Sequence, residues 1–121
     1  MSIAENLAAV DEQILRYAER AGRARDSVNL IAVAKTKPQD AVIEALQAGQ
    51  MIFGENRVQE SRGKYPDWRA DWPDLELHLI GPLQTNKTKD ALALFDVIHT
   101  VDRPKLVRSI AKEAQTVGRC P

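Results

Sequence analysis

Lys35 closes a short apolar run that begins at Leu30, and Thr36 and Lys37 follow it. Apolar surroundings favour the neutral form of a lysine over the ammonium form, because a charge is costly away from water. A neutral amine is a nucleophile toward aldehydes, which is the first requirement for a Schiff base with an aldehyde cofactor such as pyridoxal phosphate (PLP). The alternative interpretation is that Lys35 only marks where a strand meets solvent, since lysines are common at exposed strand ends.

Lys37 competes with Lys35 for this chemistry. Side chains alternate along a strand, so Ile31, Val33 and Lys35 share one face. Lys37 falls in the loop before Pro38. We therefore expect Lys35 to point into the interior of the fold, among apolar walls, and Lys37 to point into solvent.

The elements that must position these lysines alternate between helix and strand. The capping-box spacing of Ser2 and Glu5, with apolar residues every three or four positions, predicts an amphipathic helix at about 2–21. Strands are predicted after it at 29–35, 51–54, 75–80 and 96–101. Further helices are predicted from Pro38 to a stop at Gly49, at 56–64, at 85–94, and from an Asp102 cap to a stop at Gly118, with a loop at 65–74.

This alternation predicts an α/β fold of parallel βα repeats joined by right-handed crossovers. Four βα units can form a small open sheet, or they can form half of a TIM (β/α)8 barrel, whose usual length is about 250 residues. In both architectures, ligands bind at the carboxyl ends of the strands. The side chains at these four ends are therefore the candidate site.

Composition narrows the classes of function. Lysine plus arginine equals aspartate plus glutamate at 17 each, which argues against a nucleic-acid binder. The longest apolar run is far too short to span a membrane, and the N-terminus resembles no export signal. The lone Cys120 cannot form an internal disulfide, so we expect a cytoplasmic protein.

Three polar residues at the strand ends each have two interpretations. Asn56 could cap the next helix or donate to a cofactor ring, and Glu55 is expected in a surface salt bridge. His78 could be a core histidine or a pocket residue, and His99 has the same ambiguity. No second histidine or cysteine stands at metal-ligand spacing, so no metal site is predicted. Neither nucleotide-binding glycine motif is present.

Four motifs in order make these strand ends specific: A-V-A-K-T-K-P at 32–38, F-G-E-N-R-V-Q-E at 53–60, H-L-I-G-P-L-Q-T-N-K at 78–87 and H-T-V-D-R at 99–103. Over nearly the whole chain they resemble the YggS/PROSC family of PLP homeostasis proteins. The resemblance implies a barrel similar to the alanine racemase N-terminal domain. It also implies PLP as a Schiff base on Lys35, with Asn56 near the ring and His78 as a weaker pocket candidate. Family members handle and buffer PLP without established catalysis, so the resemblance implies no catalytic residue, and PLP-dependent apo-enzymes are candidate partners.

The chain departs from the family in length, because family members are roughly twice as long. Barrel phosphate sites are usually built from the loops after strands seven and eight, which have no counterpart in these residues. Residues 1–121 are therefore predicted to be the N-terminal half of a PLP-binding barrel. One alternative is a racemase-like PLP enzyme, which Tyr17 and Tyr65 support poorly because neither stands at a strand end. The other is a cofactor-free half-barrel that forms oligomers through its open sheet edges.

Overall fold

The structure, a computed structural model that describes residues 2–121, contains one sheet of four strands. All neighbouring pairs are parallel, and the spatial order follows the chain order. Each strand must therefore be followed by a crossover to its neighbour. This confirms the predicted α/β class with parallel βα repeats. The strands are β1 (Ala32–Val33), β2 (Ile52–Glu55), β3 (Glu76–Leu79) and β4 (Val97–Ile98).

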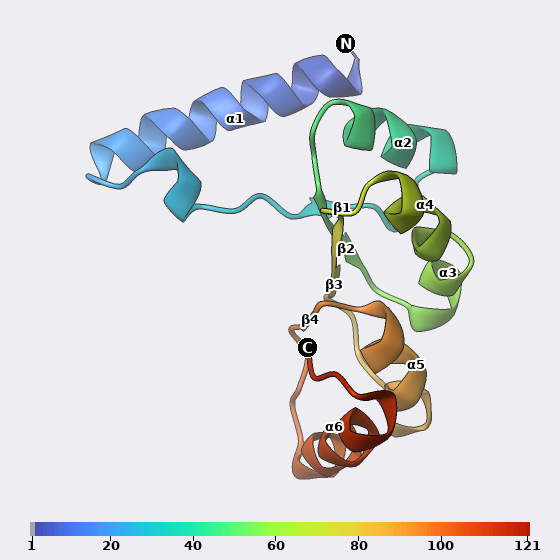
Figure 1. The fold of residues 1–121 in the computed structure, drawn as a ribbon. Helices are drawn as coiled ribbons and strands as arrows, with labels where there is room; N and C mark the ends of the chain where they lie inside the picture. Colours follow the sequence, from blue (N-terminus) through green and yellow to red (C-terminus); the bar gives the residue numbers. More distant parts are fainter. Residues whose placement is uncertain (1) are drawn as a thin grey trace.

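Helices cover only one side of this sheet. Figure 1 shows α2 to α5 on one side of the strands, with no helix of the described chain against the other side. Among residues 2–121, no helix combines the length and the hydropathy that a membrane crossing requires. The α-helices are α1 (Ile3–Arg20), α2 (Gln39–Gln47), α3 (Val58–Arg62), α4 (Tyr65–Asp71), α5 (Thr88–Leu94) and α6 (Pro104–Val117), and the 3-10 turns are η1 (Arg25–Ser27) and η2 (Thr85–Lys87).

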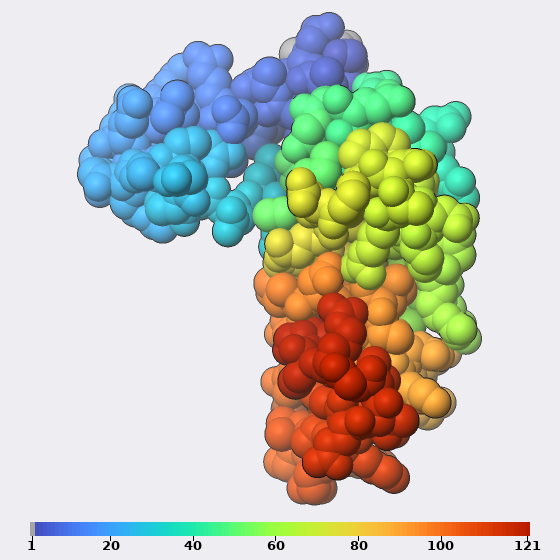
Figure 2. Space-filling model, viewed as in Figure 1, coloured from blue at the N-terminus to red at the C-terminus, as the bar shows by residue number. Residues whose placement is uncertain are grey.

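Helix α1 forms close to the predicted range and projects from the body as an arm (Figure 2). The Ser2 hydroxyl accepts a hydrogen bond from the Glu5 amide at 3.1 Å, as its capping-box position predicts. Only the first turns of α1 are held against the body. There the Ile3 amide donates to the Glu44 carboxylate at 2.8 Å, and Ile3 and Leu7 pack against the core.

The strand register decides which side chains enter the core. Phe53 pairs with Ala32 and with Leu77, and Phe53 and Leu77 are almost fully buried under the helices. The next residue of each strand points to the opposite face. On that face Val33 is 48% exposed, because no helix of the described chain covers it. The sheet therefore has one packed face and one open face.

The predicted loop at 65–74 is wrong in its first part, because residues 65–71 form α4. Pro66 stands in the first turn, where its missing amide costs no helical hydrogen bond. Tyr65 and Trp68 lie three positions apart on one helix face, and both are buried with their rings edge-on at 4.9 Å. Core burial of this aromatic pair explains a helix that turn-forming residues had obscured.

Other boundaries differ at the ends of elements. Strands β1 and β4, the two outer strands of the sheet, have two ladder residues each and are shorter than predicted. The predicted helix at 56–64 is confined to α3. The prediction that Asp102 caps the last helix is wrong: Arg103 occupies the cap position, and the Asp102 carboxylate accepts from its guanidinium instead. Gly118 ends α6 as predicted, in a left-handed conformation with φ 81°.

Glu55 is not in the predicted surface salt bridge. As the last residue of β2 it points to the helix side of the sheet, where it is buried and accepts a hydrogen bond from the Tyr65 hydroxyl at 2.7 Å. Desolvation raises the pKa of Glu55, and the Tyr65 hydrogen bond lowers it only in part. Burial and the Glu55 carboxylate together raise the pKa of Tyr65 far above its usual range. This pair fixes α4 to the end of β2.

Replacing the buried carboxylate should change how stability depends on pH. Since the folded-state pKa of Glu55 is raised, its ionisation opposes folding, and this loss grows as pH rises through the folded pKa. Glu55→Gln keeps an oxygen that accepts from Tyr65 and carries no charge. We expect the free energy of unfolding of Glu55→Gln, relative to the unsubstituted chain, to increase from pH 4 to pH 7.5 in urea titrations. Glu19→Gln on the exposed face of α1 is the control, and an equal pH dependence in both variants would contradict this account.

Candidate functional site

The carboxyl ends of the strands bring the predicted site residues to one end of the sheet. Val33, Gly54, His78 and Val97 are paired across the sheet and point to the open face. Two positions further along the chain stand Lys35, Asn56, Ile80 and His99. Lys35 lies in the turn that follows β1, and Asn56 directly follows the last residue of β2. This end of the sheet therefore carries all three predicted residues, with His78 on the open face itself.

Lys35 does not lie among apolar walls. It is exposed, as is Val33 before it. The expectation of an enclosed amine is wrong for residues 2–121, because the four-stranded sheet has nothing packed on its open face (Figure 1). Lys35 lies in the turn after β1, at the carboxyl end of the sheet as predicted.

The backbone after Lys35 is strained. The Lys37 amide donates to the Ala34 carbonyl at 3.2 Å, which closes a four-residue turn around Lys35 and Thr36. Thr36 has φ 63°, and no other non-glycine residue among those described has a positive φ. A β-branched residue in this region is a genuine outlier, and such strain clusters at binding and active sites. The turn fixes the direction in which Lys35 leaves the strand.

Asn56 is half-buried and does not cap α3 with its side chain. The cap position belongs to Arg57, which makes no side-chain cap bond. The backbone of Asn56 instead meets Gly81, where an added Cβ would lie 2.8 Å from the Asn56 Cα and closer still to the Asn56 carbonyl oxygen. Gly81 is therefore needed to let the loop after β3 reach the loop after β2.

Hydrogen bonds join the loops at this end of the sheet. The Ile80 amide donates to the Glu55 carbonyl at 2.9 Å, which extends the β2–β3 ladder. The Thr100 hydroxyl donates to the Gly81 carbonyl at 2.7 Å, and the Arg103 guanidinium donates to the Leu83 carbonyl at 2.6 Å. The loops after β2, β3 and β4 thus form one connected rim.

His78 is buried and has a partner at each ring nitrogen. Its Nε2 lies 2.7 Å from the Glu76 carboxylate, and its Nδ1 lies 2.9 Å from Nε2 of His99. His99 is not among the predicted site residues, because a single histidine near a strand end is ambiguous. The signal that could have found it is the shared face, since both histidines stand on adjacent parallel strands two residues out of register. Among residues 2–121, no three histidine, cysteine, aspartate or glutamate side chains are arranged so that they could hold a metal ion.

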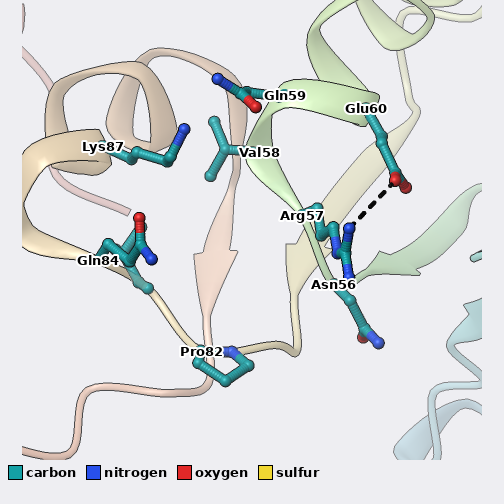
Figure 3. Close-up of a pocket in the computed structure, with 9 residues that line it drawn as sticks. Asn56, Arg57, Val58, Gln59, Glu60, Pro82, Gln84 and Lys87 are labelled. Atoms are coloured by element: carbon teal, nitrogen blue, oxygen red, sulfur yellow. Dashed lines mark ion pairs between the residues drawn. The ribbon is translucent and has the colours of Figure 1, made fainter.

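A groove of about 560 Å³ lies beside this rim, between the start of α3 and the loop after β3. Figure 3 shows Gln84 and Lys87 on one side, and the Asn56 carboxamide pointing away from both. Arg57 and Glu60 form an exposed ion pair at 3.8 Å on the α3 side. Asn56 lines the groove, but Lys35 and His78 do not. The groove is therefore adjacent to the open-face residues rather than formed by them.

Comparison with known proteins found curated relatives, although no family model matches the chain. A pyridoxal phosphate homeostasis protein of Vibrio cholerae is 46% identical over 114 residues, which cover 93% of this chain and 48% of the relative. Proteins with the same name from Pseudomonas aeruginosa and Escherichia coli K12 are 46% identical over 112 and 105 residues, covering 93% and 86% of this chain and 48% and 45% of the relatives. The chain belongs to the pyridoxal phosphate homeostasis protein family. It spans about half the length of these curated relatives.

Solved structures agree with the family assignment. PipY of Synechococcus elongatus without PLP matches with TM-score 0.85 and 43% identity, over 99% of this chain and 51% of PipY. PipY with PLP bound matches with TM-score 0.75 and 44% identity, over 89% of this chain and 50% of PipY. The fold of the described residues is therefore that of about half of PipY.

The contact between Gly81 and Asn56 can be tested by a matched pair of substitutions. Gly81→Ala places a carbon against backbone atoms that cannot rotate away, so we expect a loss of about 1–3 kcal/mol in the free energy of unfolding. Gly63→Ala meets nothing within 4 Å and has φ −81°, so it should be neutral or slightly stabilising. Urea unfolding of both variants measures the difference. Equal stabilities would show that the two loops do not need to approach each other.

Proposed function

We propose that the protein binds PLP and takes part in PLP homeostasis, with Lys35 as the point of attachment. The observation that carries this proposal is the position of Lys35. It follows β1 at the carboxyl end of a parallel sheet, stands at the same end of the sheet as Asn56 and His78, and is held by a strained turn. The homeostasis proteins among the relatives and the PLP-bound structure of PipY support the choice of cofactor.

The chemistry we propose for Lys35 is reversible. Its neutral amine would add to the PLP aldehyde, and loss of one water molecule would leave a carbon–nitrogen double bond, the predicted Schiff base. Water or a second amine reverses the bond and releases the cofactor. Reversible attachment suits a protein that buffers a reactive aldehyde and delivers it to PLP-dependent apo-enzymes, the partners we propose.

The other two residues would play different parts. The Asn56 carboxamide takes part in none of the side-chain hydrogen bonds found among residues 2–121, so it can donate to the ring substituents. The two ring nitrogens of His78 are already bonded to Glu76 and His99, so His78 would form a wall of the site rather than a ligand.

We further propose that residues 1–121 form the N-terminal half of a (β/α)8 barrel. The open face supports this, since Val33 and Lys35 would be enclosed once further strands closed the barrel. The second half of such a barrel would also supply the phosphate site, because barrels usually hold phosphate groups with the loops after later strands. Until further strands pair with them, β1 and β4 are open edges through which two copies could associate.

Binding without turnover is part of the proposal. A racemase-like enzyme needs an acid–base group on the opposite side of PLP from the lysine. Tyr17 is 61% exposed on the α1 arm, and Tyr65 is buried on the helix side with Glu55. Neither tyrosine lies on the open face. We also propose a cytoplasmic location, because the single cysteine, Cys120, is free and exposed.

Borohydride trapping tests the attachment. The chain is mixed with PLP, reduced, digested and mapped by mass spectrometry, both alone and fused to the remainder of the Vibrio cholerae relative. We expect the reduced adduct on Lys35, at higher yield in the fusion because the fusion covers the open face. Lys35→Ala should lower the yield at least tenfold.

Lys37→Ala is the matched control, because it removes an exposed amine two residues away and should keep the adduct. An adduct on Lys37 or spread over surface lysines, with none on Lys35 even in the fusion, would refute the proposal. If the protein racemises an amino acid and the Lys35→Ala variant does not, the claim of binding without turnover is overturned.

A further inference from the structure

The two histidines of the open face meet end to end. Nδ1 of His78 and Nε2 of His99 are 2.9 Å apart, while the ring centroids are 5.1 Å apart and the ring planes are inclined by 33°. Stacked rings would have centroids much closer than this when their nearest atoms touch. The two nitrogens therefore face each other directly, which is the geometry of a hydrogen bond between two imidazoles. Such a bond needs one proton between the two nitrogens.

Glu76 decides the direction of this bond. Its carboxylate lies 2.7 Å from Nε2 of His78 and can only accept, so Nε2 of His78 carries a proton. In a neutral His78, Nδ1 is then the acceptor, and His99 must donate from its Nε2. His78 is only 8% exposed, so water cannot readily replace Glu76 and His99 as its hydrogen-bond partners.

We propose that Glu76 and His99 are positioning residues that fix the orientation and protonation of His78, and that the His78–His99 pair keeps its hydrogen bond with one positive charge but loses it with two. The first proton goes to Nδ1 of the exposed His99, where it breaks no bond in the chain of three residues. A second proton would have to occupy Nδ1 of His78. Two N–H groups would then point at each other, and the contact between β3 and β4 on this face would open.

The charges around the pair allow this behaviour. On β3 the charged neighbour on this face is Glu76, which favours the first positive charge. From β2, the positions on this face are Ile52 and Gly54, with Asn56 after the strand, and none of them carries a charge. Asp96 directly precedes β4. Its carboxylate does not contact the pair, because it accepts hydrogen bonds from Arg69, Arg119 and the Leu77 amide. Lys35, the cation of the proposed site, stands two strands away at the end of β1.

This inference does not depend on PLP binding, although the pair stands at the same end of the sheet as Lys35. A second proton would add positive charge to the open face and release His99 from it. The pair is thus a pH-sensitive contact in the wall of the proposed site.

NMR with labelled histidine tests the pair without any cofactor, since the chain contains only two histidines. At pH 7.5 we expect a scalar coupling across the hydrogen bond between Nδ1 of His78 and Nε2 of His99. On acidification the coupling should disappear, and the ring signals should titrate in two steps. In His99→Gln, the charge that opposes protonation of His78 is gone. His78 should then titrate in one step, with a midpoint about one pH unit higher than its step in the unsubstituted chain.

Two further variants separate positioning from packing. Glu76→Gln keeps an acceptor for His78 but removes the charge, so the first step should move to lower pH while the coupling remains. Glu60→Gln, an exposed carboxylate on α3, should leave both steps unchanged. Absence of the coupling in the unsubstituted chain, or titrations of the two rings that ignore each other, would overturn the proposal even if no variant folded. Failure to trap PLP on Lys35 would leave these NMR results unaffected.

Discussion

The pairing register of the four parallel strands is the constraint on which the structure depends. Because side chains alternate along each strand, a register fixed at Ala32, Phe53 and Leu77 determines both faces at once. One face buries its residues under helices. The other carries the two histidines, and Lys35 and Asn56 stand at its carboxyl end. A slip of one residue in any strand would exchange the core for the site, so burial of the helix side also positions the chemistry.

Two glycines make this register possible at the site end. A side-chain carbon on Gly54 would lie 3.0 Å from Ile31 and 3.1 Å from Ile80, so a larger residue would push neighbouring side chains of the open face apart. Gly81 lets the loop after β3 lie against the backbone of Asn56. With the bonds from Thr100 and Arg103, these approaches make the strand-end loops one rim.

Local sequence signals predicted the elements whose causes are local. The Ser2 cap, the apolar periodicity of α1 and the stop at Gly118 all formed where expected, because caps and periodicity act within one helical turn. Helix α4 was missed because its reason is distant: Tyr65 reaches Glu55 on β2, ten residues back along the chain. Burial of Glu55 has the same cause: alternation puts its carboxylate on the face of Phe53, but its partner Tyr65 comes from α4.

The sequence by itself determined the parallel α/β class, the family and the row of polar strand ends, because these follow from the alternation of strands and helices and from four motifs in order. Only the tertiary structure decided how exposed each of those residues is. Lys35 is exposed because no layer of the described chain covers it. Asn56 is half-buried, and its backbone lies against Gly81 of the loop after β3. His78 and His99 became a pair only when two strands placed their rings end to end. Exposure and pairing depend on contacts between distant segments, and no local pattern in the sequence records them.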